Sequence, residues 1–211
     1  YENVICPYSN TELINVPCLH FQQIVDSEGY VHRRHFRVAG KISVTNCIST
    51  VVMRVKPEYS SVGSSWVGGG IGYQIGFVKL DDGLLKLRGY CKNWQQTNFK
   101  LAPGTWLDLA VVKSGESNLK FYAVTNNGTL FSQSKNATGI SSSGVQTNFY
   151  LGLSESGYSS WNPVATNGTS LRKMAFRGSL HSIAVWNRQL SEAEIREAFA
   201  FPRSDVVRIG V

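Results

Sequence analysis

Short stretches in which apolar and polar residues alternate follow one another along most of the chain, and Gly, Pro, Asn or Ser separates them. This pattern predicts half-buried β-strands, because successive side chains of a strand point to opposite faces of its sheet. The clearest case is residues 72–90, "GYQIGFVKLDDGLLKLRGY". Asp82 and Gly83 tolerate the positive φ of a tight turn, so this stretch predicts a hairpin.

Similar stretches predict roughly ten to twelve strands in all, at the spacing of a β-sandwich. Three of them lie within residues 105–134, joined at Ser114-Gly115 and Asn127-Gly128, and residues 35–44 predict two short strands. Ser- and Gly-rich stretches predict long loops. The other strands are expected in residues 47–57, 147–154 and 173–186, and the loops near residues 60–70, 139–144 and 154–162.

One segment near the C-terminus has the signals of a short α-helix. Ser191 is a good N-cap, and Glu194 three residues later completes a capping box, in which each side chain accepts a hydrogen bond from the other residue's backbone N–H. Leu190 and Ile195 occupy the positions of a hydrophobic staple, and Pro202 ends the helix. Such an amphipathic helix is expected to lie on a sheet, which is a structural role.

The length and composition fit one all-β domain. The chain has 211 residues with no internal repeat and no dividing linker, so we expect a single domain over 1–211. Within it, residues 1–34 are expected to be partly irregular, and 202–211 to be a tail or the start of a linker to another module. No stretch approaches the roughly 20 apolar residues of a membrane span, so none is expected.

The chain is basic, with a formal net charge of +7. Such a charge suits an acidic polysaccharide, a nucleic acid or a membrane surface, or it is simply a solvated basic surface. No basic run with interleaved aromatic residues is present, so a nucleic-acid partner is not expected. The basic stretch 31–37, "VHRRHFR", has charge on both faces, which is typical of an exposed edge strand or loop. A basic patch for an acidic ligand is the alternative.

The four cysteines are Cys6, Cys18, Cys47 and Cys91. None forms a C-x-x-C pair, so zinc is not expected. Cys6 and Cys18 bracket a short loop and could form one disulfide, and Cys47 and Cys91 could form a second. An even number of cysteines suits a secreted or cell-surface protein.

The stretch 178–195, "GSLHSIAVWNRQLSEAEI", resembles the closing motif of laminin-G-like domains in the concanavalin A-like lectin/glucanase jelly-roll superfamily. Residues 103–112 and 118–128 resemble earlier motifs of the same domains, so the resemblance covers about 35–200. It implies an all-β jelly-roll β-sandwich of two antiparallel sheets with one short C-terminal helix. The sequence departs from many relatives at His181 and Ser182, where acidic residues are common, and at Asp108, where a His is common.

The resemblance implies glycan binding, and the tryptophans are the first candidates for it. Trp106 and Trp186 lie in predicted strands and are expected in the core. Trp66, Trp94 and Trp161 stand in polar or Gly-rich stretches, where an exposed ring could stack on a sugar; packing beneath long loops is the alternative. Further candidates are the rings of Tyr59 and Tyr158, the polar or charged residues Arg88, Lys92, Asn93 and Gln95 beside Trp94, and the glycine run 68–70.

Calcium binding is implied by the same resemblance, because many such jelly rolls hold the ion with loop oxygens. Asp26, Glu28 and Asp81 are conceivable ligands, since calcium prefers carboxylate and carbonyl oxygens. Nothing in the sequence fixes their geometry, so calcium remains one alternative and the absence of any cofactor is the other.

Two other function classes stay open. A glycoside hydrolase needs two carboxylates that flank the bond, and the laminarinase-type Glu-x-Asp-x-x-Glu signature is absent, as are the sets typical of polysaccharide lyases. A structural domain that packs against a catalytic module is the other alternative. The sequence favours a non-catalytic carbohydrate-binding or adhesion module of a larger secreted protein, whose ligand is a polysaccharide or glycoconjugate, an acidic one if the net charge contributes.

Overall fold

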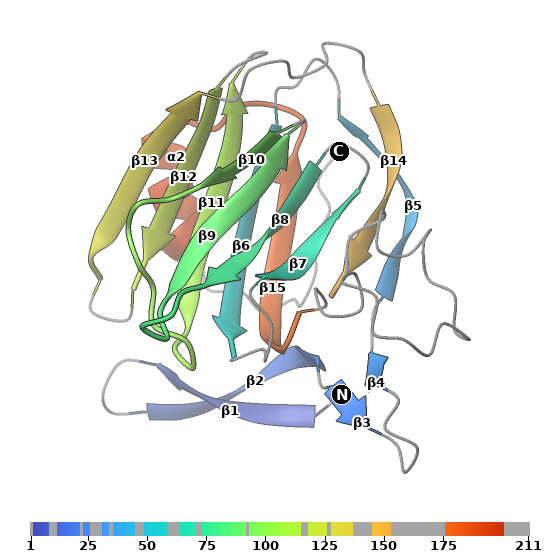
Figure 1. Ribbon diagram of the computed structural model, residues 1–211, viewed down its shortest axis with the longest axis vertical. Helices are drawn as coiled ribbons and strands as arrows, with labels where there is room; N and C mark the ends of the chain where they lie inside the picture. Colours follow the sequence, from blue (N-terminus) through green and yellow to red (C-terminus); the bar gives the residue numbers. More distant parts are fainter. Residues whose placement is uncertain are drawn as a thin grey trace.

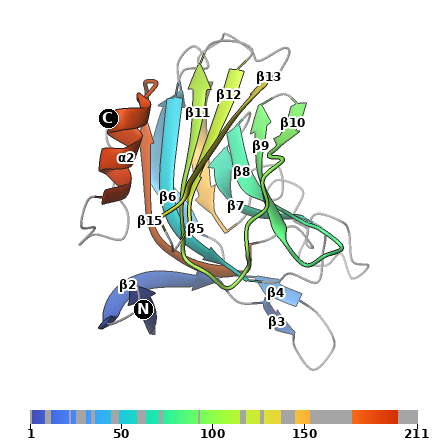
Figure 2. The same ribbon diagram turned by 90° about the vertical axis from the view of Figure 1, so that its left-hand side faces the viewer.

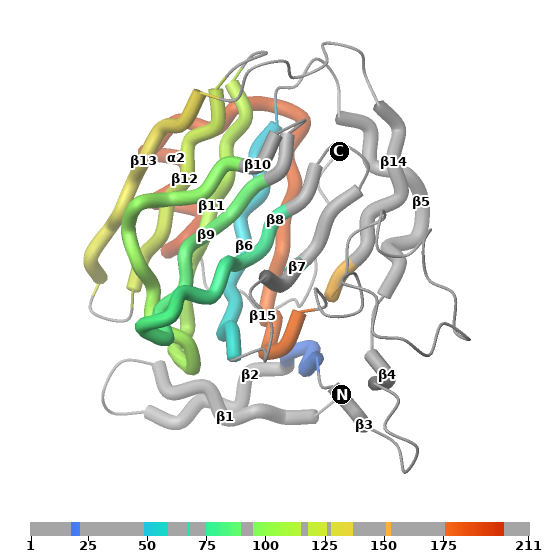
Figure 3. The backbone as a smooth tube through the Cα atoms, in the orientation of Figure 1, coloured from blue at the N-terminus to red at the C-terminus, as the bar shows by residue number. Residues whose placement is uncertain are grey.

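The chain forms two antiparallel β-sheets that face each other, as the computed structural model in Figures 1 and 2 shows. Figure 3 colours the part of the backbone for which side chains are described. The backbone is described for residues 2–8, 12–21, 23–25, 31–33, 36–44, 49–58, 64–70, 73–91, 93–114, 118–125, 128–136, 145–152 and 176–200. Side chains are described for residues 18–21, 49–58, 67, 75–89, 95–114, 118–125, 128–136, 151–152 and 176–200.

The first sheet has seven strands in the order β1-β2-β15-β6-β11-β12-β13. Strands that are neighbours in this sheet can come from distant parts of the chain, since β15 from the C-terminal region lies between β2 and β6. The strands are β1 (Glu2–Tyr8), β2 (Glu12–Phe21), β6 (Ser49–Pro57), β11 (Leu107–Ser114), β12 (Asn118–Val124), β13 (Leu130–Asn136) and β15 (Gly178–Trp186).

The second sheet has six strands in the order β10-β9-β8-β7-β14-β5, and β3 and β4 form a separate small sheet. The basic stretch 31–37 is divided, because 31–33 belong to the small sheet, 34–35 lie outside the described residues, and only 36–37 belong to β5, which ends the six-stranded sheet. Its exposure stays a prediction. The strands are β5 (Phe36–Val44), β7 (Ser64–Gly70), β8 (Tyr73–Lys79), β9 (Leu85–Cys91), β10 (Asn93–Gln96) and β14 (Val145–Leu151), with β3 (Gln23–Val25) and β4 (Val31–Arg33) apart.

The jelly-roll sandwich and the hairpin of residues 72–90 are confirmed, and three details differ. Residues 36–44 form one strand rather than two, and the Ser- and Gly-rich segment 64–70 is strand β7 rather than a loop. Four strands lie in the described parts of residues 2–33, and the expected irregularity within 1–34 stays a prediction. The described residues contain fifteen strands, above the predicted ten to twelve, because strand ladders at the N-terminus lack a clear apolar alternation.

The core lies between the two sheets and is built from the apolar side chains of alternate strand positions. Phe176 joins the layers, since its ring centroid lies 5.6 Å from that of Phe21 and 6.5 Å from that of Phe77. Trp106 is buried as expected, whereas Trp186 is half-buried on the other side of the seven-stranded sheet, beneath the helix. Among the described side chains, the other large ones that are fully buried are Phe121, Met53, Ile75, Leu87, Leu101, Leu107, Leu109, Leu119 and Leu180.

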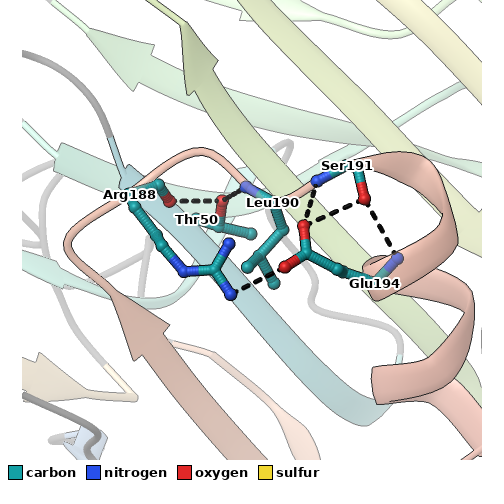
Figure 4. Close-up of polar contacts among 5 residues, drawn as sticks. All are labelled: Thr50, Arg188, Leu190, Ser191 and Glu194. Carbon is teal, nitrogen blue, oxygen red and sulfur yellow. Dashed lines mark hydrogen bonds and ion pairs between the residues drawn. The ribbon is translucent and has the colours of Figure 1, made fainter.

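Helix α2 (Glu192–Ala200) covers part of the outer face of the seven-stranded sheet (Figure 2). The capping box is confirmed: Glu194 Oε2 accepts a hydrogen bond from the Ser191 backbone N–H at 2.7 Å, and the Glu194 backbone N–H donates to Ser191 Oγ at 3.3 Å (Figure 4). Leu190 and Ile195 are both buried in one cluster, as a hydrophobic staple requires. The helix is therefore structural, and Pro202 lies outside the described residues.

The helix cap predicts a specific loss of stability in acid. The Arg188 guanidinium, 2.7 Å away, followed by the backbone N–H and hydroxyl of Ser191, lowers the pKa of Glu194 from its ordinary value to about 2. A carboxyl whose pKa is depressed by folding stabilises the fold above its unfolded pKa, near 4.3, and this contribution disappears as the pH falls towards the folded value. We expect the difference in melting temperature between wild type and Glu194→Gln to be constant above pH 5 and to vanish near pH 2. Thermal unfolding across that range checks this, and a difference that does not change with pH would contradict it.

Candidate functional site

The outer face of the six-stranded sheet can be identified from the residues whose side chains are buried in the core on its inner face. Ile75, Phe77, Leu85 and Leu87 are buried in the core, and a Cβ added at Gly89 would lie 3.1 Å from a ring carbon of Phe121 in the opposite sheet. Residues directly opposite each other in antiparallel strands share a face. The positions that alternate with these inward ones therefore lie on the outer face.

One cross-strand row on this face is rich in aromatic residues, and we call it the aromatic row. It crosses all six strands, so its ends are about 24 Å apart at about 4.8 Å per strand. The register runs Trp94 (β10), Tyr90 (β9), Gln74 (β8), Gly69 (β7), Tyr150 (β14) and Arg37 (β5).

A second row, which we call the arginine row, runs beside the aromatic row. Its register is Gln96, Arg88, Gly76 and Trp66, from β10 to β7. Arg88 is half-buried, and this burial lowers the pKa of its guanidinium, which remains charged at neutral pH. Gly76 is buried between Arg88 and Trp66 in the row. The register positions of these two adjacent rows therefore include aromatic, amide and cationic residue types.

The edge of the face at β10 is fixed to the other sheet by the segment that follows it. The Asn98 backbone N–H donates to Gln133 Oε1 at 2.6 Å, and Lys135 Nζ donates to Asn98 Oδ1 at 3.0 Å. The rings of Phe99 and Phe131 stack with centroids 5.5 Å apart. These contacts join the segment that follows β10 to the edge strand β13, next to the β10 end of the aromatic row.

The structure separates the predicted site residues. Trp66, Trp94 and Arg88 occupy the outer face, whereas Asn93 and Gln95 alternate with Trp94 and fall on the other face, with Gln95 opposite Gly89. The glycine run 68–70 lies within β7, where Gly69 belongs to the aromatic row. Trp161, Tyr59, Tyr158 and Lys92 lie outside the described residues.

Sequence reasoning missed several members of the two rows. Tyr90 and Gln96 could have been found, because the hairpin alternation that buries Leu85 and Leu87 also sets the opposite face of β9 and β10. Tyr150 and Arg37 could not, since their pairing with β7 joins strands far apart in the chain. Their register also follows an irregularity between Asn148 and Tyr150.

Comparison with solved structures assigns the fold. A heptameric SAP-like pentraxin from Limulus polyphemus matches with a TM-score of 0.58 at 16% identity, over 82% of this chain and 80% of that one. The fold that these structures share with the chain is a jelly-roll β-sandwich. Two more jelly rolls match: domain 4 of the extracellular GH43 arabinanase AbnA from Geobacillus stearothermophilus, solved with arabinotriose, at a TM-score of 0.52, and a proposed carbohydrate-binding protein from Bacteroides ovatus at 0.54.

These likenesses establish the jelly roll and no more, because the identities are low. The arabinanase domain is 19% identical over 84% of this chain and 80% of that one, and the Bacteroides ovatus protein 13% identical over 85% and 46%. No protein-family model matches the chain, and a search of curated proteins finds no relative.

The three residues at which the sequence departs from the laminin-G-like pattern, Asp108, His181 and Ser182, all lie in strands of the seven-stranded sheet. Asp108 lies directly opposite Arg54 on the neighbouring strand, and Asp108 Oδ2 accepts a hydrogen bond from Arg54 Nη1 at 3.0 Å. Both side chains are largely buried. His181 and Ser182 are buried in β15, at a register shift beside β6. These positions belong to the seven-stranded sheet, so they do not contribute to the outer face of the six-stranded sheet.

The predicted metal ligands do not come together in the described part of the chain. Asp81 is exposed in the turn between β8 and β9, and Asp26 and Glu28 lie outside the described residues. Among the residues that are described, no group of three or more His, Cys, Asp or Glu is placed to hold a metal ion. Calcium binding therefore stays a prediction.

The register of β1 and β2 bears on the cysteines. Cys6 pairs with Ile14 and Cys18 with Glu2, so their Cα atoms stand four residues apart along the ladder, roughly 13 Å. A disulfide spans less than about 7 Å between Cα atoms, so this register does not bring the predicted pair together. Cys47 and the side chain of Cys91 lie outside the description, and their pairing stays a prediction.

None of the helical segments in the described ranges has the length and hydrophobicity needed to cross a membrane.

Proposed function

We propose that the protein is a non-catalytic carbohydrate-binding module whose glycan lies across the outer face of the six-stranded sheet. The observation that carries this proposal is the aromatic row, with Trp94 and Tyr90 towards one edge, Tyr150 towards the other and Gly69 between them. Aromatic rings stack on the apolar C–H faces of sugar rings, and the glycine position lets a ligand approach the backbone closely.

Polar residues on the same face suit the hydroxyl groups of a sugar. Gln74 and Gln96 occupy the two rows. An amide both donates and accepts hydrogen bonds, so it can pair with a hydroxyl in either direction. Arg88 adds five donors in a fixed plane. A sheet face positions such groups more precisely than a loop does, which suits recognition of an extended chain.

The residue types on the sheet favour binding over cleavage. None of the six described strands of this sheet contains Asp or Glu. Glycoside hydrolases generally use two carboxylates that flank the scissile bond. The solved domain of the arabinanase, which has the same fold and was crystallised with arabinotriose, also supports a sugar ligand for this chain. By the same likeness we infer that the module acts outside the cell, as part of a larger secreted protein.

Trp94→Ala tests the proposal directly. We expect it to weaken polysaccharide binding at least about tenfold, equivalent to about 1.4 kcal/mol, because the stacking surface at one end of the aromatic row is lost. Affinity electrophoresis through gels that contain neutral or acidic polysaccharides measures this, and assays for new reducing ends and unsaturated products run on the same samples.

Gln95→Ala is the matched control, since Gln95 is the next residue of β10 but lies on the opposite face. Its affinity is expected to stay at the wild-type value. Equal weakening in both variants would contradict a site on the outer face, and cleavage products would replace binding with catalysis.

A further inference from the structure

We propose that the glycan on this face is a polyanion, whose carboxylate or sulfate groups pair with the arginine and lysine residues of the six-stranded sheet. This inference rests on the proposed function and names its ligand class. The six strands of the sheet contain no acidic residue, and their basic residues are Arg37, Lys41, Lys79, Lys86 and Arg88.

The lack of acidic residues distinguishes the strands of this sheet from those of the other sheet. The strands of the seven-stranded sheet carry both signs, with Glu2, Glu12 and Asp108 among their residues. There Asp108 neutralises Arg54 directly. Within the six described strands no carboxylate offsets the field of the cations, and a surface of one charge attracts ligands of the opposite charge.

The register places the cations in two groups on the outer face. Lys86 and Arg88 alternate with buried residues of β9, and Arg37 and Lys41 lie on the edge strand β5, opposite Tyr150 and Asn148. Four strand intervals separate β9 from β5, which is roughly 19 Å. A ligand that meets both groups must therefore carry negative charges at more than one place along its length. This is a property of a repeating acidic polysaccharide rather than of a single terminal acid.

Amide residues favour a glycan over a nucleic acid. Gln74, Gln96, Gln146 and Asn148 fall at outer-face register positions beside the rings and the cations. The phosphate groups of DNA offer only acceptors, so the oxygen of each amide could find a donor only at a base edge. Sugar hydroxyls both donate and accept, and they satisfy both halves of the amide.

Matched polymers that differ only in charge test the ligand class. Dextran is compared with dextran sulfate, and methyl-esterified polygalacturonate with its de-esterified form, by affinity electrophoresis of the full chain. We expect the anionic member of a pair to bind at least about tenfold more tightly, and its advantage to shrink with added salt, because salt screens the ion pairs. Equal affinity for both members of each pair, with Trp94→Ala still weakening binding, would overturn this inference and leave the proposed function intact. Failure of every polysaccharide to bind would overturn both.

Two variants, each of which removes one positive charge, distinguish the effect of a charge on this face from the effect of the protein's net charge. Arg88→Gln changes the arginine row, and Arg196→Gln changes the exposed side of α2 on the other sheet. We expect about a fivefold or greater loss of affinity for dextran sulfate with Arg88→Gln and none with Arg196→Gln. Lys86→Gln, half-buried on the same face, replaces Arg88→Gln if thermal unfolding shows that variant to be unfolded. Equal losses on and off the face, or tighter binding of oligo-dT than of the anionic glycans, would overturn the inference.

Discussion

Replacing Gly178 with alanine is expected to destabilise the fold by about 4 kcal/mol or more, in the range reserved for severe substitutions. Gly178 is the first residue of β15 and has φ of 139°, which side chains rarely adopt. A Cβ there would lie 2.2 Å from the Lys56 carbonyl oxygen and 2.9 Å from the ring of Phe176. Neither neighbour can yield, because the first is strand backbone and the second packs between the sheets. The melting temperature should fall by about 8 °C or more.

Gly104→Ala separates the clash from the backbone strain in this prediction. Gly104 also has a positive φ, of 74°, but a Cβ there would meet nothing within 4 Å. Its replacement should therefore cost only the conformational penalty, about 1–2 kcal/mol. Thermal or denaturant unfolding of the two variants gives the comparison. Equal losses would show that the close approach at Gly178 contributes nothing, and would remove this explanation of why a glycine opens the closing motif.

Local signals account for the parts of the fold that the sequence predicts well. The hairpin of β8 and β9 follows from alternation on either side of a turn, where Gly83 has the expected positive φ of 84°. The helix follows from a cap whose groups are neighbours in sequence. In both cases the interacting residues are within a few positions of one another. Propensity and pattern then act in the same direction as the tertiary contacts.

The candidate site depends on the register between strands that are far apart in the chain, and the sequence does not predict that register. The polar neighbours of Trp94 in the sequence make it a candidate, but those neighbours, Asn93 and Gln95, alternate to the other face. In β7, an irregularity between Trp66 and Gly68 shifts the alternation by one residue. Such a shift moves every later side chain to the other face. A bulge of this kind has no reliable signature in a run such as "SSWVGGG", so the rows emerge only from the paired strands.

Thr50→Val is expected to destabilise the protein by about 3 kcal/mol, because it leaves two backbone groups without partners. The Thr50 side chain is fully buried on β6, beneath the connection from β15 to α2. Its hydroxyl donates to the Arg188 carbonyl and accepts from the Leu190 backbone N–H, both at 2.9 Å (Figure 4). Valine has nearly the same shape but can do neither. We expect the melting temperature to fall by about 6–12 °C, measured by thermal unfolding.

Thr50→Ser is the matched variant, because it keeps the hydroxyl and loses only a methyl group, at a cost of about 1 kcal/mol. If the two substitutions lower the stability equally, the Thr50 hydroxyl does not stabilise the connection between β15 and α2. The two variants also test whether α2 and the seven-stranded sheet affect only stability while the six-stranded sheet binds the ligand. Thr50 and α2 lie on the outer side of the seven-stranded sheet, away from the aromatic row. At temperatures where it is folded, Thr50→Val should therefore bind polysaccharide with wild-type affinity, since the cap stabilises the sandwich while the opposite sheet binds the ligand. A loss of affinity in the folded variant would place the helix in the binding function and not only in the fold.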